Sequence, residues 1–193
     1  MKNNCHHLRE RRLGSRRAYE GKVVKVDEDT VRLPNGREAR REVVRHPGAV
    51  LIVPVLEDGR VVLIRQYRYA PDEVLWELPA GTLDRRAESA EACAQRELEE
   101  ETGYRAEHWT FLTKFYTTPG FTDELMHCFL ATGLTPAEQC PDTDEAMEVV
   151  LMPLTEALAL AQGGEIRDGK TIAGLFLAAA HLGLGWPPSP LPT

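Results

Sequence analysis

The sequence predicts an α/β fold in which helices cover a mixed β-sheet, preceded by a small antiparallel β subdomain. The apolar runs 49–56 (AVLIVPVL) and 125–132 (LMHCFLAT) have the length and composition of strands buried on both faces. Helical spacing of small and apolar side chains occurs at 90–102 and 155–162, and in a last segment that ends at 182. These alternating elements predict layers of helix, sheet and helix.

The β subdomain is expected over residues 18–46. Residues 19–33 alternate apolar and polar side chains and are followed by Pro34-Asn35-Gly36, where Asn-Gly tolerates the positive φ of a tight hairpin. Residues 37–46 are expected to return as the second strand. The preceding segment, 1–17, carries six basic residues against one acidic residue and is expected to be a flexible arm.

The main domain is expected over 47–184, and its last helix is expected to be capped by Asp168 or Thr171. The segment 185–193 is rich in proline and is expected to be an unstructured tail. Further strands are expected at 60–69, 75–78, 109–116 and 147–152.

Composition excludes several classes of function. A net charge of −7 argues against general nucleic-acid binding, which needs a basic face. No apolar run approaches the roughly 20 residues of a membrane span. The four cysteines lack the spacing of a metal site or a disulfide scaffold, which predicts free thiols and a cytoplasmic protein.

An acidic helix is the strongest chemical signal in the chain. In the helix expected over 90–102, Glu97 lies one turn from both Glu100 and Glu101, so three carboxylates share one face. Arg96 neutralises only part of this charge. Hard divalent cations such as Mg²⁺ prefer oxygen ligands of this kind, although a solvated acidic face would have the same composition.

The segment that contains this helix resembles the sequence box of the Nudix hydrolases, G-x5-E-x7-R-E-U-x-E-E-x-G-U, where U is aliphatic or aromatic. Gly81 opens the match, and residues 96–104 (RELEEETGY) complete it. Six residues, in place of the family's five, separate Gly81 from Glu88, so the role of Glu88 stays open. A match at this many fixed positions is far more selective than a lone glycine loop.

The resemblance implies an α/β/α sandwich and a Mg²⁺ site, with Mn²⁺ or another divalent ion as an alternative. It implies that Glu97 and Glu101 are the main metal ligands, that Glu100 binds directly or through water, and that Ala80 contributes its carbonyl. It also implies that Arg96 holds a helix glutamate in position.

Residues outside the box resemble the ADP-ribose pyrophosphatase branch of the family. Pro119, in a Pro119-Gly120 turn, stands sixteen residues beyond Gly103, where that branch often carries a proline. The branch further implies a diphosphate contact from Arg68. The water-activating base is then expected at Glu145, with Asp144 and Glu148 as neighbours that could take the role.

In the same branch the N-terminal hairpin is exchanged between two subunits and helps to build each adenosine pocket. The resemblance therefore implies a homodimer, with Glu42 and Arg45 as candidate substrate contacts. Tyr19 is the aromatic residue expected near the adenine.

The expected function is Mg²⁺-dependent hydrolysis of ADP-ribose to AMP and ribose 5-phosphate. The alternatives are a pyrophosphatase for another nucleotide sugar or dinucleotide, and a catalytically silent nucleotide-binding module. In each case the partner is a small nucleoside diphosphate derivative.

Overall fold

The computed structural model describes residues 5–22, 24–83, 88–140 and 146–184. The chain forms two compact units. The N-terminal unit consists of Met1–Pro47 and Tyr116–Leu125, and the main unit consists of Gly48–Phe115 and Met126–Thr193.

The N-terminal unit is built on a three-stranded antiparallel sheet in the order β1-β2-β3. A short 3-10 helix, η1, precedes it. A turn closed by the Gly21 N–H and the Val24 carbonyl, 2.9 Å apart, joins the first two strands, and Gly36 supplies the expected positive φ (83°) in the second turn. The elements are η1 (His6–Leu8), β1 (Arg11–Glu20), β2 (Lys25–Arg32) and β3 (Glu38–Arg45).

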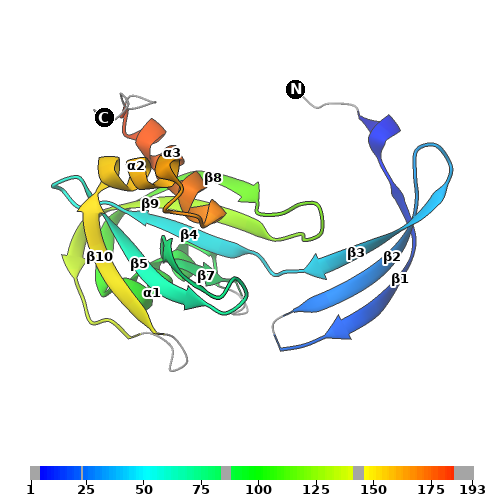
Figure 1. The fold of residues 1–193 in the computed structure, drawn as a ribbon, viewed down its shortest axis with the longest axis horizontal. Coiled ribbons are helices and arrows are strands. Elements are labelled where there is room, and N and C mark those ends of the chain that lie inside the picture. Colours follow the sequence, from blue (N-terminus) through cyan, green and yellow to red (C-terminus); the bar gives the residue numbers. More distant parts are fainter. Residues whose placement is uncertain (1–4, 23, 84–87, 141–145, 185–193) are drawn as a thin grey trace. The chain divides into compact units, whose positions relative to one another are not determined.

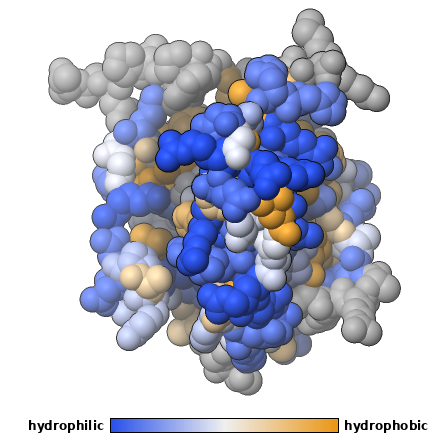
Figure 2. Space-filling view, turned by 90° about the vertical axis from the view of Figure 1, so that its right-hand side faces the viewer, coloured by the Kyte–Doolittle hydropathy of each residue, from blue (hydrophilic) through white to orange (hydrophobic). Residues whose placement is uncertain are grey.

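The sequence prediction of a flexible arm over 1–17 is wrong for residues 11–17, which form most of β1. The basic side chains of this strand pair with acidic side chains of β2: Arg16 with Glu28 at 3.3 Å and Arg17 with Asp27 at 2.6 Å. Complementary charge across the strands therefore stabilises a segment that has little apolar surface to bury. Every residue of β1 is exposed. The side of the molecule that is at the right in Figure 1 faces the viewer in Figure 2, and its surface is mainly hydrophilic.

The main unit contains two sheets. One is antiparallel, in the order β10-β5-β6, and the other has the order β7-β4-β9-β8. In the second sheet β4 is parallel to β9 and antiparallel to β7, which confirms the predicted mixed sheet. The strands are β4 (Ala49–Pro54), β5 (Arg60–Arg68), β6 (Glu73–Glu77), β7 (Ala80–Thr82), β8 (Tyr104–Tyr116), β9 (Leu125–Pro136) and β10 (Met147–Pro153).

Strand β4 is buried on both faces, as its continuous apolar run predicts. Val50 and Ile52 belong to the apolar cluster around α1, whereas Leu51 and Val53 belong to the cluster with α2 and α3. Helix α1 thus covers one face of the mixed sheet and the other two helices cover the opposite face (Figure 1). The helices are α1 (Ala90–Thr102), α2 (Leu154–Gly163) and α3 (Gly169–His181), the last capped by the Asp168 carboxylate.

None of the helices among the described residues is long and apolar enough to cross a membrane.

Candidate active site

Helix α1 begins and ends at the residues predicted from the sequence. The Ser89 side chain accepts a hydrogen bond from the Ala92 N–H at 3.1 Å, and Gly103 closes the helix in the left-handed conformation with φ 69°. Ala94 and Leu98 are fully buried against the sheet. The apolar stripe fixes the helix on β4, and its acidic residues are thereby directed to the adjoining face.

Arg96 lies at the centre of three carboxylates. It binds Glu88 through Nε and Nη2 at 3.0 and 3.2 Å, and its Nη1 binds both Glu97 at 2.6 Å and Glu100 at 2.8 Å. Burial by itself would lower the pKa of Arg96, but the hydrogen bonds that it donates to Glu88 and Glu100 raise the pKa above its usual range. Glu88 therefore holds Arg96 despite the longer loop.

Strand β7, at Ala80 and Gly81, contacts the two glutamates predicted as main metal ligands. The Ala80 N–H donates to Glu101 Oε2 at 3.0 Å, and Glu101 is only 5% exposed. A Cβ added at Gly81 would lie 2.1 Å from Cδ of Glu97. A side chain at position 81 would therefore force the Glu97 side chain to move.

These residues fit a hard divalent cation. One cationic nitrogen, Arg96 Nη1, contacts Glu97 and Glu100 together, so the two carboxylates converge on one point. Among the described residues no three acidic, histidine or cysteine side chains are arranged to hold a metal ion by themselves. The site would therefore need the Ala80 carbonyl, water or substrate oxygens as further ligands, as is usual for Mg²⁺.

Arg68, at the end of β5, is bound by a buried acid that the sequence reasoning missed. Its Nε and Nη2 donate to the two carboxylate oxygens of Glu77 at 2.7 and 2.6 Å, and Glu77 is 1% exposed. These hydrogen bonds raise the pKa of Arg68. Glu77 is the last residue of β6 and directly precedes Leu78-Pro79. A charged residue in this otherwise apolar strand end could have indicated a role for Glu77 from the sequence.

A pocket of about 400 Å³ in the N-terminal unit gathers several of the other predicted residues. Glu42, Pro119 and Gly120 all line it. Two exposed aromatic side chains that the sequence prediction did not include, Tyr116 and Phe121, line the pocket as well. Their positions on either side of the Pro119-Gly120 turn could have identified them in the sequence. Tyr19 is not among the lining residues.

Arg45 is held by three aspartates of the N-terminal unit. It donates to Asp27 and Asp29 at 2.9 Å each and to Asp123, a pocket residue, at 3.2 Å. Its pKa is raised, chiefly by the hydrogen bond to Asp27. The guanidinium thus orients Asp123 at the pocket wall.

The predicted base, Glu145, and its neighbour Asp144 lie outside the described residues. Glu148, the other neighbour, is on β10, where its exposed carboxylate pairs with Arg65 at 3.4 Å.

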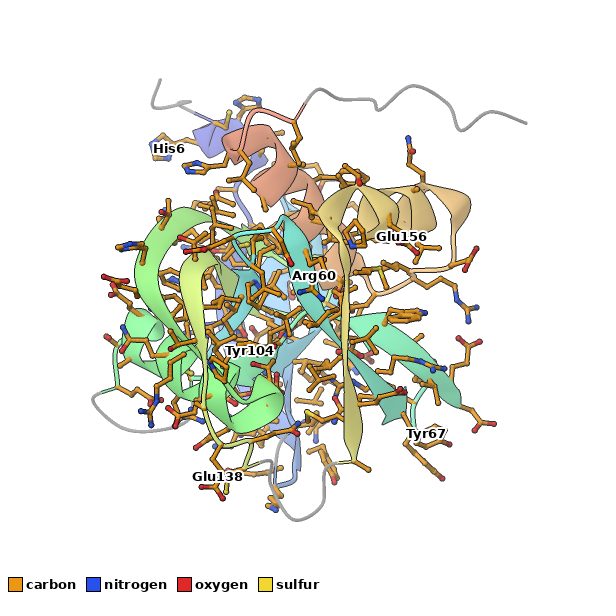
Figure 3. All side chains as sticks on the ribbon, turned by 90° about the vertical axis from the view of Figure 1, so that its left-hand side faces the viewer. His6, Arg60, Tyr67, Tyr104, Glu138 and Glu156 are labelled. Carbon is orange, nitrogen blue, oxygen red and sulfur yellow. The ribbon has the colours of Figure 1, made fainter. Side chains whose placement is uncertain are left out.

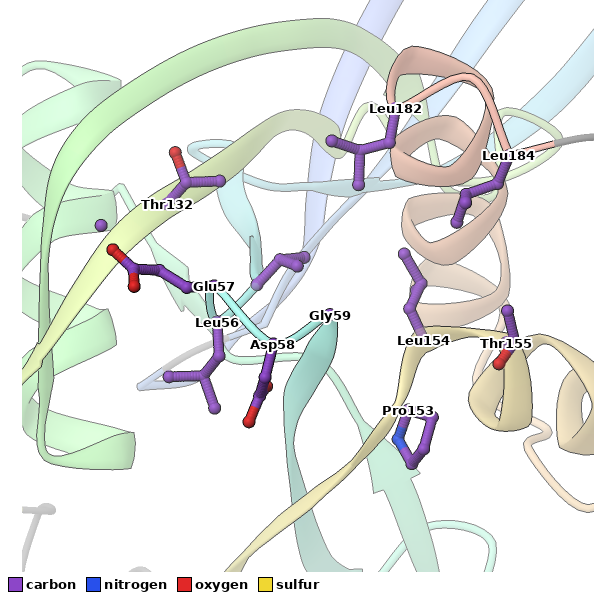
Figure 4. Close-up of a pocket in the computed structure, with 12 residues that line it drawn as sticks. Leu56, Glu57, Asp58, Gly59, Thr132, Pro153, Leu154, Thr155, Leu182 and Leu184 are labelled. Carbon is purple, nitrogen blue, oxygen red and sulfur yellow. The ribbon is translucent and has the colours of Figure 1, made fainter.

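A second pocket, of about 490 Å³, lies in the main unit (Figure 4). It is lined by Val55, the turn 56–59, Thr132 and Gly133 of β9, the junction of β10 and α2 at 153–155, and Leu182 and Leu184, which follow α3. Because Leu51 of β4 pairs with Ala80, and Val55 is four residues further along, this pocket is about 13 Å along the chain from β7, the strand that contacts the glutamates. It contains none of the predicted site residues.

A family model described as the NUDIX domain matches residues 45–175. The chain belongs to the Nudix family. A second model, the nucleoside diphosphate sugar hydrolase N-terminal domain, matches residues 10–44 of this Nudix chain. Members of the family need divalent metal ions, in agreement with the ligand chemistry at α1.

Relatives of this Nudix chain cover nearly its full length. It is 42% identical over 166 residues to an ADP-ribose pyrophosphatase of Bacillus subtilis (strain 168), covering 85% of this chain and 89% of the relative. It is 38% identical to an ADP-ribose pyrophosphatase of Mycobacterium tuberculosis, covering 87% and 82%. A crystal structure titled ADP compounds hydrolase superposes with a TM-score of 0.82 at 26% identity, covering 91% and 95%.

Proposed function

We propose that this chain hydrolyses the diphosphate of ADP-ribose, with Mg²⁺ bound at α1, to give AMP and ribose 5-phosphate. The observation that carries the proposal is the contact of Glu97 and Glu101 with Gly81 and Ala80 of β7, beside the guanidinium of Arg96. The ADP-ribose pyrophosphatases among its relatives support an ADP derivative as the substrate.

The residues of α1 would hold the metal ion and fix its position. When bound, a divalent ion neutralises charge on the diphosphate and lowers the pKa of a bound water. Glu97, Glu100, Glu101 and the Ala80 carbonyl are the proposed ligands, and Mn²⁺ would suit the same oxygens. Arg96 orients Glu97 and Glu100 through charge-assisted hydrogen bonds.

Arg68 is the proposed diphosphate contact. Glu77 engages its Nε and Nη2, which fixes the plane of the guanidinium. Nη1 then offers its two N–H groups to a phosphate oxygen, and the buried partner reduces the entropy lost on binding.

Glu145 is the proposed base that takes a proton from the attacking water. This assignment rests on the sequence, with Asp144 and Glu148 as alternatives.

The pocket of the N-terminal unit is the proposed site for the nucleoside end. Tyr116 and Phe121 offer aromatic faces on which a base can stack, and Glu42 offers acceptor oxygens for an exocyclic amine. Pro119 and Gly120 complete the wall, and Arg45 supports it through Asp123.

We also propose a cytoplasmic homodimer formed through the N-terminal unit. Strand β1 is an edge strand whose side chains are exposed along its whole length, so its outer backbone groups are suited to pairing with a second copy. A monomeric mass by light scattering would exclude the dimer. All four cysteines are free thiols, as a reducing compartment requires.

Purified protein, Mg²⁺ and ADP-ribose provide the direct test, with the products separated by anion-exchange chromatography. AMP and ribose 5-phosphate are expected in equal amounts. Glu101→Gln should lower turnover about a hundredfold or more, because a displaced metal ion forfeits several kcal/mol of transition-state stabilisation. Its circular dichroism should match the wild type, since the substitution removes a repelling charge.

Each alternative gives a different result in the same assay. The match to a nucleoside diphosphate sugar hydrolase domain favours another nucleotide sugar as the second candidate, and preferential cleavage of such a compound would replace ADP-ribose as the substrate. Equal and negligible rates for wild type, Glu101→Gln and Glu145→Gln would identify a nucleotide-binding module without catalysis.

A further inference from the structure

The last turn of α1 places acidic side chains at the negative end of the helix dipole. It contains Glu99, Glu100 and Glu101 and no basic residue, although the carbonyl end of a helix carries partial negative charge. The final carbonyls of a helix also lack partners within the helix, so this turn is where a helix frays. Two of the proposed metal ligands, Glu100 and Glu101, therefore stand on a turn whose carbonyls need partners from outside the helix.

Residues 137–140, which follow β9, donate hydrogen bonds to this end of the helix. We name them the brace. The Cys140 N–H binds the Glu100 carbonyl at 3.1 Å, and the Ala137 N–H binds the Gly103 carbonyl at 2.7 Å. The side chain of Gln139 donates through Nε2 to the Glu101 carbonyl at 2.6 Å.

The brace also packs tightly against the residue that ends the helix. A Cβ added at Gly103 would lie 3.2 Å from Cβ of Gln139 and 3.3 Å from the Ala137 carbonyl oxygen. Gly103 is thus required both for its positive φ of 69° and for the approach of the brace.

Glu101 is consequently fixed at two points. Its carboxylate accepts from the Ala80 N–H, and its carbonyl accepts from Gln139. A donor at the carbonyl neutralises part of the negative charge at the helix end and keeps the last turn helical, which holds the Glu100 and Glu101 carboxylates at their spacing.

We propose that Gln139 is a positioning residue that sets the geometry of the metal-ligating carboxylates through the Glu101 backbone. The proposal rests on the metal site of the proposed function but does not depend on which nucleotide is cleaved. Its effect is therefore measured on metal binding as well as on turnover.

The experiment is calorimetric titration of Mn²⁺ into the full chain without nucleotide. Gln139→Met keeps the length of the side chain and removes its N–H donors, and we expect the Kd for Mn²⁺ to rise roughly three- to tenfold, the loss of one hydrogen bond. Gln139→Lys restores a donor next to the carbonyls and should return the Kd to within about twofold of wild type.

Glu138→Gln is the matched control. Glu138 is exposed, points outward in Figure 3, and has no ion pair or side-chain hydrogen bond with any described residue. Its substitution changes charge beside the helix without removing the donor, so it should leave the Kd within about twofold of wild type.

Two results would overturn the proposal. A lower melting temperature for Gln139→Met with an unchanged Kd for Mn²⁺ would show that Gln139 only stabilises the fold, and wild-type protein that binds no Mn²⁺ would remove the site itself. Metal binding that weakens as expected, in a protein that leaves ADP-ribose intact, would instead support the role of Gln139 and reject the proposed substrate.

Discussion

Each of the two units contains an arginine that is bound by three carboxylates. Arg96 binds Glu88, Glu97 and Glu100 in the main unit, and Arg45 binds Asp27, Asp29 and Asp123 in the N-terminal unit. Each cluster has more acidic than basic groups, and in each the pKa of the arginine is raised. The same chemistry serves two purposes.

The clusters differ in how far along the chain their members lie. The partners of Arg96 are 8, 1 and 4 residues away, whereas those of Arg45 are 18, 16 and 78 residues away. The first cluster orients Glu97, which also packs against Gly81 of β7, and Glu100. The second links segment 116–125 to the strands of the N-terminal unit. One cluster shapes a site, and the other joins distant parts of a unit.

Of the substitutions that compare the two clusters, removal of Arg96 should have the largest effect. In Arg96→Met, three partly buried glutamates lose their shared cation, so we expect turnover to fall 10- to 100-fold through misplaced ligands. Stability should fall by on the order of 3 kcal/mol without metal. Steady-state kinetics and thermal unfolding with and without Mg²⁺ measure both effects.

Added Mg²⁺ should stabilise Arg96→Met more than the wild type, because an ion can occupy the position that the guanidinium leaves. Arg105→Met is the control: Arg105 binds Glu99 on the exposed side of the helix, and its loss should change stability far less than the loss of Arg96. Normal turnover by Arg96→Met would show that the Arg96 cluster does not shape the site.

The short chain distances within the Arg96 cluster explain why helix α1 could be predicted from the sequence. Ser89, Gly103 and the spacing of Glu97, Glu100 and Glu101 are all contained in one segment, where helical periodicity determines which side chains meet. The alternate burial of β4 was likewise predictable, because a strand with two buried faces has a nearly continuous apolar run.

The non-local features could not be predicted in the same way. Nothing in the spacing of Glu77 and Arg68 indicates that β5 and β6 bring them together, and Gln139 reaches Glu101 only because β9 ends beside α1. Strand β1 was missed because its stabilising charges lie on β2, so its basic composition resembles that of a solvated arm. Contacts between residues that only the tertiary fold brings together cannot be inferred from local sequence patterns.

Substitution of Arg45 should affect stability and substrate binding more than the chemical step. In Arg45→Met, Asp29, which is 5% exposed, would lose its arginine partner in the described structure. Because the Arg45 side chain is itself 31% exposed, we expect a loss of about 2 kcal/mol in the free energy of unfolding. Urea unfolding measures it.

Movement of Asp123 should also raise the KM of Arg45→Met for ADP-ribose while kcat stays within about twofold, in contrast to Arg96→Met. Arg60→Met, which removes an exposed pair with Asp58 in the main unit, is the control for loss of a surface arginine. A fall in kcat with unchanged KM for Arg45→Met would contradict the expectation that the Arg45 cluster serves substrate binding and the Arg96 cluster serves the chemical step.

Acid should weaken the Arg45 cluster, and its effect on the free energy of unfolding should be the smallest of these. Hydrogen bonds from Arg45 and then Arg17 hold the pKa of Asp27 below its ordinary value of 3.8. A carboxyl whose pKa is lowered by folding contributes stability that is complete above its unfolded pKa and is lost as the pH falls through the folded value. The difference in stability between wild type and Asp27→Asn, from urea unfolding at pH 7, 5, 4 and 3, should therefore be constant down to about pH 5 and shrink below pH 4. A difference that persisted undiminished at pH 3 would show that these arginines do not act on Asp27 through its charge.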